Sequence, residues 1–208
     1  MKLLLTGFEP FGGSTVNPSE QVVRALANGA LPDVELHTAV LPVDRASGPA
    51  ALLRAVREFQ SDAVLCLGEA SGRAAISIER VALNLMDYRL ADNAGNQVMD
   101  EPVVSEGPAA YFVTLPVRAM LEAMKAANVP AELSLSAGAF LCNQVLFQLL
   151  HHLALNEAST RAGFVHVPSL PEQVVNKDRL IPSMSLGIML TGIRAAITAI
   201  ANGSKDHA

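Results

Sequence analysis

The 208-residue chain has no tryptophan, two cysteines and five histidines. The cysteines, Cys66 and Cys142, lie in different sequence contexts, so a disulfide framework is not expected and a reducing cytoplasm is the simpler assumption. The histidines show neither Cys-x-x-Cys nor His-Glu-x-x-His spacing. We therefore expect no metal site and no cofactor.

Runs of basic residues and long apolar runs are also missing. The formal net charge is -5, which gives no electrostatic footprint for nucleic acid. The apolar stretch at residues 2–6 stops at Gly7 and is far too short for a signal peptide or a membrane span. We expect a cytosolic chain that binds neither nucleic acid nor membrane.

Half of the residues are hydrophobic and 17% are charged, which predicts a single globular domain over residues 1–208. Apolar runs and helical periodicities alternate, as in an α/β domain. The expected strands cover 2–6, 34–41, 63–68, 75–84, 110–115, 131–135 and 163–168. The expected helices follow Asn17-Pro18 and cover 44–59, 117–127, the segment after Cys142, and 184–201. Residues 86–108 show no period, which is typical of a lid or an oligomer contact.

Cys142 follows a strand and a run of small residues, and it opens an amphipathic helix. At a helix N-terminus the dipole favours a thiolate, and unpaired N–H groups could hold an oxyanion. Position alone still favours a structural thiol, because cysteine is among the most buried residue types. Cys66, inside an apolar strand, is expected in the core.

Two further polar residues interrupt apolar strands. Glu79 either faces solvent or is a carboxylate that orients an imidazole. His166 is either a core histidine bonded to a carbonyl or a ligand-side residue at the carboxyl end of its strand. If the three residues meet, Cys142, His166 and Glu79 form the constellation of a thiol hydrolase.

Two glycine-containing loops allow a rival hypothesis. The loop at 7–13 carries Phe8 and Phe11, which either fill the core or line a pocket. The loop at 68–73 lacks the Gly-x-Gly-x-x-Gly order and a following helix. The rival hypothesis is a non-catalytic nucleotide-binding α/β module that uses both loops.

Four motifs, spread over nearly the whole chain, resemble the motifs of a known family. They are Thr6-Gly-Phe-Glu-Pro-Phe-Gly-Gly13 with Asn17-Pro18, Gly68 to Arg73 leading to Ser77-Ile-Glu79-Arg80, Ser134-x-x-Ala-Gly-x-Phe-x-Cys142-Asn143, and His166-Val-Pro with Leu170-Pro-Glu-Gln173. The chain thereby resembles the type I pyroglutamyl peptidases, also called pyrrolidone-carboxyl peptidases.

The resemblance implies a cysteine peptidase that removes an N-terminal pyroglutamyl residue from peptides. Cys142 would be the nucleophile, His166 the general base and Glu79 the residue that orients His166. The resemblance also implies an α/β/α sandwich of three layers around a mostly parallel, mixed sheet, a cytosolic homotetramer and no cofactor.

The resemblance further assigns the substrate pocket. Phe8 and Phe11 would line it, Asn17 would bond the lactam, and Arg89 would lie near the oxyanion. These residue types suit pyroglutamate, a compact uncharged ring with one amide N–H and one carbonyl.

Overall fold

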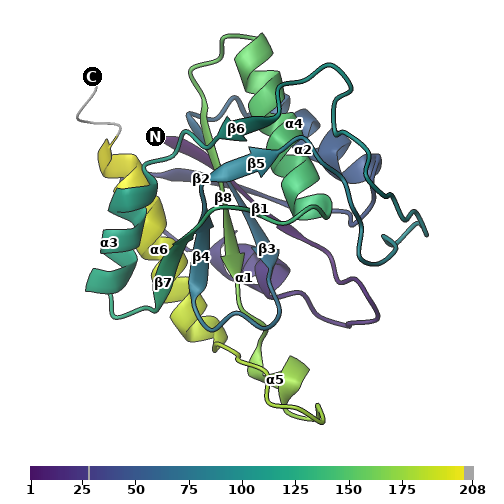
Figure 1. Ribbon diagram of the computed structural model, residues 1–208. Coiled ribbons are helices and arrows are strands. Elements are labelled where there is room, and N and C mark those ends of the chain that lie inside the picture. The colour runs from purple at the N-terminus through teal and green to yellow at the C-terminus, as the bar shows by residue number, and fades with distance from the viewer. Residues whose placement is uncertain (28, 204–208) are drawn as a thin grey trace.

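A six-stranded sheet lies between two layers of helices in the computed structural model, which describes residues 1–27 and 29–203 (Figure 1). The strand order is β2-β1-β3-β8-β4-β7. The bounds are β1 Lys2–Phe8, β2 Glu35–Leu41, β3 Ala63–Glu69, β4 Ile76–Glu79, β7 Ala131–Ser134 and β8 Arg161–Val167. β1, β2, β3 and β8 are mutually parallel, whereas β4 runs antiparallel to β8 and parallel to β7. The predicted α/β class and mixed sheet are confirmed.

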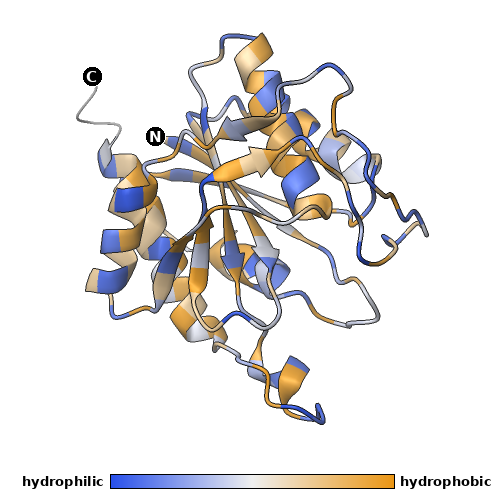
Figure 2. Cartoon of the chain, in the orientation of Figure 1, coloured by the Kyte–Doolittle hydropathy of each residue, from blue (hydrophilic) through white to orange (hydrophobic). Residues whose placement is uncertain are grey.

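Each face of the sheet carries its own core. One face packs against α1 (Pro18–Ala27), α3 (Val117–Ala126) and α6 (Leu186–Gly203), and the other against α2 (Ser47–Phe59) and α4 (Leu141–Leu155). Successive strand residues point to opposite faces, so Leu65 lies in the first core and Cys66 in the second. This double burial explains the nearly continuous apolar runs of the central strands (Figure 2).

The closing helix α6 is apolar enough to span a membrane by length and composition, with a mean hydropathy of 1.3. Its buried side chains, such as Met189 and Ile193, nevertheless pack with Met120 and Met124 of α3. The apolar face of α6 is therefore used inside the protein, as in a core helix.

The single strand predicted at 75–84 is wrong, because the chain changes sheets in its middle. β4 ends at Glu79, and β5 (Val81–Leu83) pairs with β6 (Ala110–Phe112) in a separate antiparallel ribbon. The chain passes from one sheet to the other at Arg80. Its N–H donates to Ser134 O, while its carbonyl accepts from Val113 N. The two backbone groups of one residue thus bond to different neighbours.

The strand predicted at 2–6 is longer than expected, because β1 continues through Gly7 to Phe8. A Cβ on Gly7 would lie 2.6 Å from the carbonyl oxygen of Ser19. The glycine therefore allows the start of α1 to approach the strand. The hydroxyl of Ser19 accepts a hydrogen bond from Phe8 N at 3.0 Å and joins the two elements.

Residues 86–108 contain no helix or strand longer than a bridge, as predicted, but they are packed. Met86 forms a β-bridge with Glu101, and Met86, Tyr88 and Val98 make a small buried cluster. The Tyr88 hydroxyl donates to Gln144 Oε1 on α4. The connection is thus an ordered wall beside the start of α4. A short helix, α5 (Pro171–Val174), interrupts the 169–183 segment, where no element was predicted.

Candidate active site

Cys142 is the second residue of α4, in the first turn as predicted. The N–H groups of Asn143 and Gln144 already bond to the carbonyl of Phe140, at 3.1 and 3.2 Å. The first N–H groups of a helix have no intrahelical partner. Those of Leu141 and Cys142 itself are therefore the donors that could bind an oxyanion beside the thiol.

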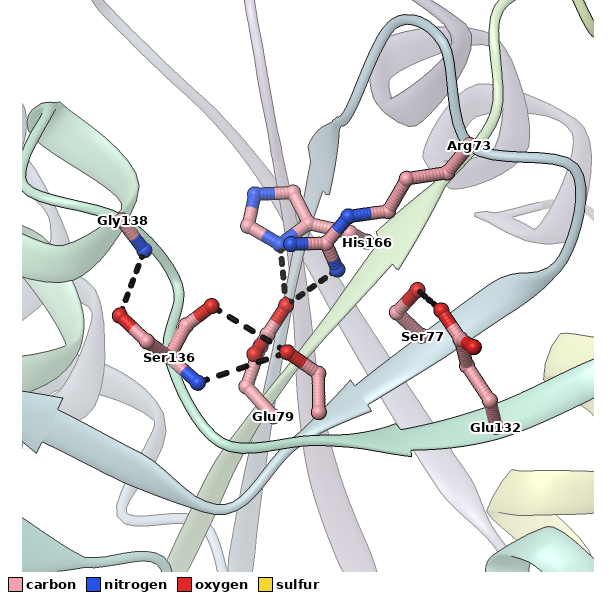
Figure 3. A network of polar contacts seen from close by, with 8 residues as sticks. Arg73, Ser77, Glu79, Glu132, Ser136, Gly138 and His166 are labelled. Carbon is pink, nitrogen blue, oxygen red and sulfur yellow. Dashed lines mark hydrogen bonds and ion pairs between the residues drawn. The ribbon is translucent and has the colours of Figure 1, made fainter.

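The loop before α4 is held by short-range hydrogen bonds (Figure 3). Ser136 N donates to Ser134 Oγ at 3.4 Å, and Gly138 N donates to Ser136 Oγ at 3.1 Å. Gly138 has a φ of 80°, in the left-handed region that favours glycine. The small residues before Cys142 thus make the turn from β7 into α4.

Gly68 of β3 lies directly beneath the thiol. A Cβ at this position would stand 2.9 Å from Cys142 Sγ and 2.8 Å from the Phe164 ring. Sγ therefore lies over the carboxyl end of β3, which is possible only because residue 68 has no side chain. Cys66, two residues earlier on the same face, is fully buried in the core as predicted.

Glu79 and His166 form a buried hydrogen bond, with 2.8 Å between Oε1 and Nδ1 (Figure 3). Glu79 lies opposite Phe164 in the antiparallel register, and Ser77 lies opposite His166. Glu79 and His166 are thus diagonal neighbours on one face of the sheet. His166 lies near the carboxyl end of its strand, but Glu79 does not reach that edge, because β4 runs the other way. Register, not converging strand ends, brings the carboxylate to the imidazole.

Arg73 shares the carboxylate of Glu79, with 2.8 Å between Nη1 and the same Oε1. Burial alone would raise the pKa of Glu79, but the hydrogen bond and charge of His166, with the Arg73 guanidinium, hold it below its usual value. Glu79 is therefore ionised at neutral pH. An ionised partner keeps the proton of His166 on Nδ1 and leaves Nε2 as the basic nitrogen.

Burial, together with the smaller effect of the Glu79 charge, raises the pKa of the Cys142 thiol to about 12. A helix N-terminus contributes about 0.3–1 kcal/mol, which is less than one pKa unit of about 1.4 kcal/mol. The helix position is therefore too weak to give the free thiolate that the sequence suggested. In the resting protein Cys142 is a thiol, and it needs a base to become a nucleophile.

A cavity of about 300 Å³ opens beside these residues. Every predicted site residue except Glu79 lines it, namely Phe8, Phe11, Asn17, Arg89, Cys142 and His166. Glu79 is fully buried behind His166. The structure thus brings all seven predicted residues to one place.

Two of the predicted pocket residues, Asn17 and Arg89, differ in their burial. Asn17 is fully buried, donates to Glu9 O at 2.9 Å and accepts from Ser19 N at 3.0 Å. It therefore caps α1 and fixes the loop as well as bordering the cavity. Arg89 is exposed at the rim.

The sequence did not single out several residues that line the same cavity, among them Glu69, Arg73, Asp87 and Phe140. Phe140 stacks on Phe11, with ring centroids 6.0 Å apart. The position of Arg73 in the sequence does not indicate its role, because its contact with Glu79 depends on the bend between β3 and β4. Within residues 1–27 and 29–203, no group of three or more His, Cys, Asp or Glu side chains could hold a metal ion.

The loop at 68–73 does not have the form of a phosphate-binding loop. It leads into β4 instead of a helix, and its Arg73 is engaged by Glu79. Phosphate-binding glycine loops present the N-terminus of the helix that follows them. The nucleotide-binding hypothesis is therefore not favoured.

Comparisons with known proteins agree with this geometry. A family model described as pyroglutamyl peptidase matches residues 1–203. The chain is 47% identical to a pyrrolidone-carboxylate peptidase of Vibrio vulnificus, over 99% of this chain and 95% of the relative. The solved structure of pyroglutamyl peptidase I from Bacillus amyloliquefaciens superposes with a TM-score of 0.93, at 38% identity over 97% of both chains. That of a pyrrolidone carboxyl peptidase from Thermococcus litoralis gives 0.95, at 37% identity over 100% of this chain and 96% of the other.

Proposed function

The chain belongs to the pyroglutamyl peptidase family, and we propose that it removes an N-terminal pyroglutamyl residue from peptides through an acyl-thioester on Cys142. One observation carries the assignment of roles. A thiol at a helix start borders the same cavity as a histidine whose Nδ1 is bonded to a buried carboxylate.

The reaction follows from these positions. His166 Nε2 takes the thiol proton as Cys142 Sγ attacks the pyroglutamyl carbonyl carbon. The oxyanion is held by the N–H groups at the start of α4. The imidazolium then gives its proton to the leaving amine, and the C–N bond breaks. Water, deprotonated by His166, hydrolyses the thioester and regenerates the thiol.

Glu79 stabilises the imidazolium that forms in both steps. Because Glu79 is already ionised, it need not accept a proton to do so. The raised pKa of Cys142 makes this support necessary, since proton transfer from a neutral thiol would otherwise be unfavourable.

The cavity suits a small uncharged ring. Phe8 and Phe11 supply apolar walls, Asn17 supplies an amide near the lactam, and Arg89 stands at the rim, where it assists the oxyanion. A charged N-terminal amine would lose hydration against the two rings. This cost disfavours general aminopeptidase action.

The direct test is hydrolysis of a pyroglutamyl anilide, with the alanyl anilide as the matched control because the leaving group is the same. We expect cleavage of the first and negligible cleavage of the second. Equal rates would contradict the assignment of the pocket, and no cleavage of either would contradict the activity. Nucleotide titration should release no heat of binding, and a clear binding heat would favour the rival module.

We further propose a cytoplasmic homotetramer that binds neither nucleic acid nor membrane. Both cysteines are free, as expected in a reducing compartment. The net charge of -5 opposes binding to nucleic acid. Large apolar side chains such as Phe112, Leu135 and Val175 are more than two thirds exposed in the single chain. Burial of such side chains between subunits would support an oligomer.

A further inference from the structure

Arg73, from the loop between β3 and β4, and His166, from β8, both reach the buried carboxylate of Glu79 (Figure 3). Both donors lie 2.8 Å from the same oxygen, Glu79 Oε1. The Glu79 side chain is fully buried, whereas that of Arg73 is 32% exposed. We propose that Arg73 is a positioning residue that fixes the carboxylate of Glu79 against His166 and offsets its charge toward Cys142. This inference rests on the proposed function of that site.

The geometry limits how the carboxylate can turn. A carboxylate with one donor can rotate about its side-chain bonds and still keep that bond. Two donors on one oxygen, from a loop and from a neighbouring strand, fix where that oxygen lies. Oε1 is the atom that holds the imidazole, so Arg73 fixes the orientation of the base without touching the thiol.

The charges of Glu79 and Arg73 support the same role for Arg73. Glu79 opposes formation of a thiolate at Cys142, and Arg73 favours it. A buried carboxylate without a cation beside it would act on the thiol at full strength, since screening is weak in the interior. Arg73 is thus the counter-charge that allows a carboxylate to orient the base without blocking the nucleophile.

Other groups near the pair can titrate or carry charge, and they come from β3, from β7 and from the 86–108 loop. They are Cys66, Glu69, Asp87, Tyr88, Arg89 and Glu132, which is bonded to Ser77 at 2.9 Å. Glu69 is bonded by Ser169 Oγ at 2.8 Å and by Gln173 Nε2 at 3.1 Å. Arg73 and Arg89 are the two arginines that line the cavity, and Arg73 is the one paired with Glu79.

The charge of Arg73 determines the direction in which the pKa of Cys142 should change when that charge is removed. Removal of a positive charge makes it harder for a nearby group to lose a proton, so the Cys142 thiol should titrate at higher pH. The whole pH profile should move upward in Arg73→Gln, on the order of one pH unit. A purely structural role for Arg73 would lower the rate without moving the profile.

The test measures alkylation of Cys142 by iodoacetamide against pH, with the modified cysteine identified by mass spectrometry. The midpoint is the pH at which half of Cys142 is alkylated in a fixed time, and it moves with the pKa of the thiol while lying below it. Arg73→Gln should move the midpoint upward, and Arg73→Lys, which keeps the charge, should leave it near that of the wild type. Arg24→Gln is the matched control, because it removes an ion pair with Glu20 (2.7 Å) in which neither residue lines the cavity. Its midpoint should not change.

Alkylation needs no substrate, so its result separates this inference from the proposed function. If the anilide is not cleaved but the midpoint moves, the proposed function fails and the role of Arg73 stands. A folded Arg73→Gln with an unmoved midpoint overturns the inference. If Arg73→Gln does not fold, Arg73→Lys decides. A midpoint that moves by as much as one pH unit in Arg73→Lys overturns the inference. An unmoved midpoint together with a reduced kcat on the anilide supports the inference.

Discussion

Cys142 is a half-buried thiol with a raised pKa, so in the proposed mechanism its reactivity depends on His166 and not on its place at a helix start. Cys142→Ala should lower hydrolysis of a pyroglutamyl anilide by roughly 10³-fold or more, because no other thiol borders the described cavity. Cys66→Ala is the matched control, since Cys66 lies in the core, and it should keep its kcat while losing about 1 kcal/mol of stability. The reverse pattern would make Cys66 the nucleophile.

In the proposed mechanism Glu79 acts through its charge and through the hydrogen bond to His166 Nδ1. Glu79→Gln keeps the volume but removes the charge, and its amide can donate to Nδ1 and favour the wrong tautomer. We expect kcat to fall by roughly 10²- to 10⁴-fold, by analogy with the effect of amide substitution in other triads. Steady-state kinetics, with circular dichroism to confirm the fold, measure this. An unchanged kcat would refute the orienting role.

At the scale of elements, α4 is tied to the polar loop by Asn143, the residue that follows Cys142. The fully buried Asn143 side chain accepts from Leu83 N at 2.8 Å and donates to the carbonyls of Leu83 and Leu85, at 2.8 and 2.9 Å. It thereby fixes β5 and the entry to the 86–108 loop against the helix.

Asn143→Ala should therefore destabilise the protein by about 2–4 kcal/mol, because three backbone groups lose a buried partner. Urea unfolding measures the change. Asn156→Ala, at the exposed end of the same helix, is the control and should change stability by about 0.5 kcal/mol or less. Equal losses would show that Asn143 is not the tie between helix and loop.

The elements themselves were largely predictable, because strands buried on both faces read as apolar runs and Asn17 reads as a cap for α1. The direction of β4 was not predictable, because the sequence of a strand does not indicate which neighbour the strand pairs with. Cys142, His166 and Glu79 were predicted as residue types with a suitable chemistry. Arg73 was missed because its ion pair with Glu79 depends on the bend that follows β3.

At the scale of the whole molecule, buried carboxylates tie stability to pH. Burial tends to raise the pKa of Asp92, but hydrogen bonds from Asn96, Arg45 N and Ala94 N hold it below its ordinary value. The pKa of Glu79 is lowered too. A lowered carboxyl pKa adds stability above the ordinary value of about 4, and this stability is lost as pH falls through the lowered pKa.

We therefore expect the free energy of unfolding to fall steeply below about pH 4. Asp92→Asn should be less stable than the wild type at pH 7 and should show a shallower loss toward acid, so that the two curves approach each other. Urea unfolding between pH 3 and 7 measures both curves. Parallel curves would mean that Asp92 does not contribute to the acid sensitivity.

The proposed assembly is tested at the same scale. Sedimentation equilibrium should give a mass four times that of one chain. If exposed apolar side chains form the contacts, Phe112→Asp should shift the population toward smaller species, because a charge would be buried at the interface. A monomer at all concentrations would refute the homotetramer.

The hydrogen bond between Glu79 and His166 joins residues 87 positions apart. Helix α4 and its thiol are a local structure that forms early in folding, whereas a contact across such a span waits for the sheet to assemble. During refolding the chain would regain helical signal before Cys142 acquires its base. Recovery of catalysis should therefore lag behind recovery of secondary structure, and a newly synthesised chain would become a peptidase only when its last strands are in register.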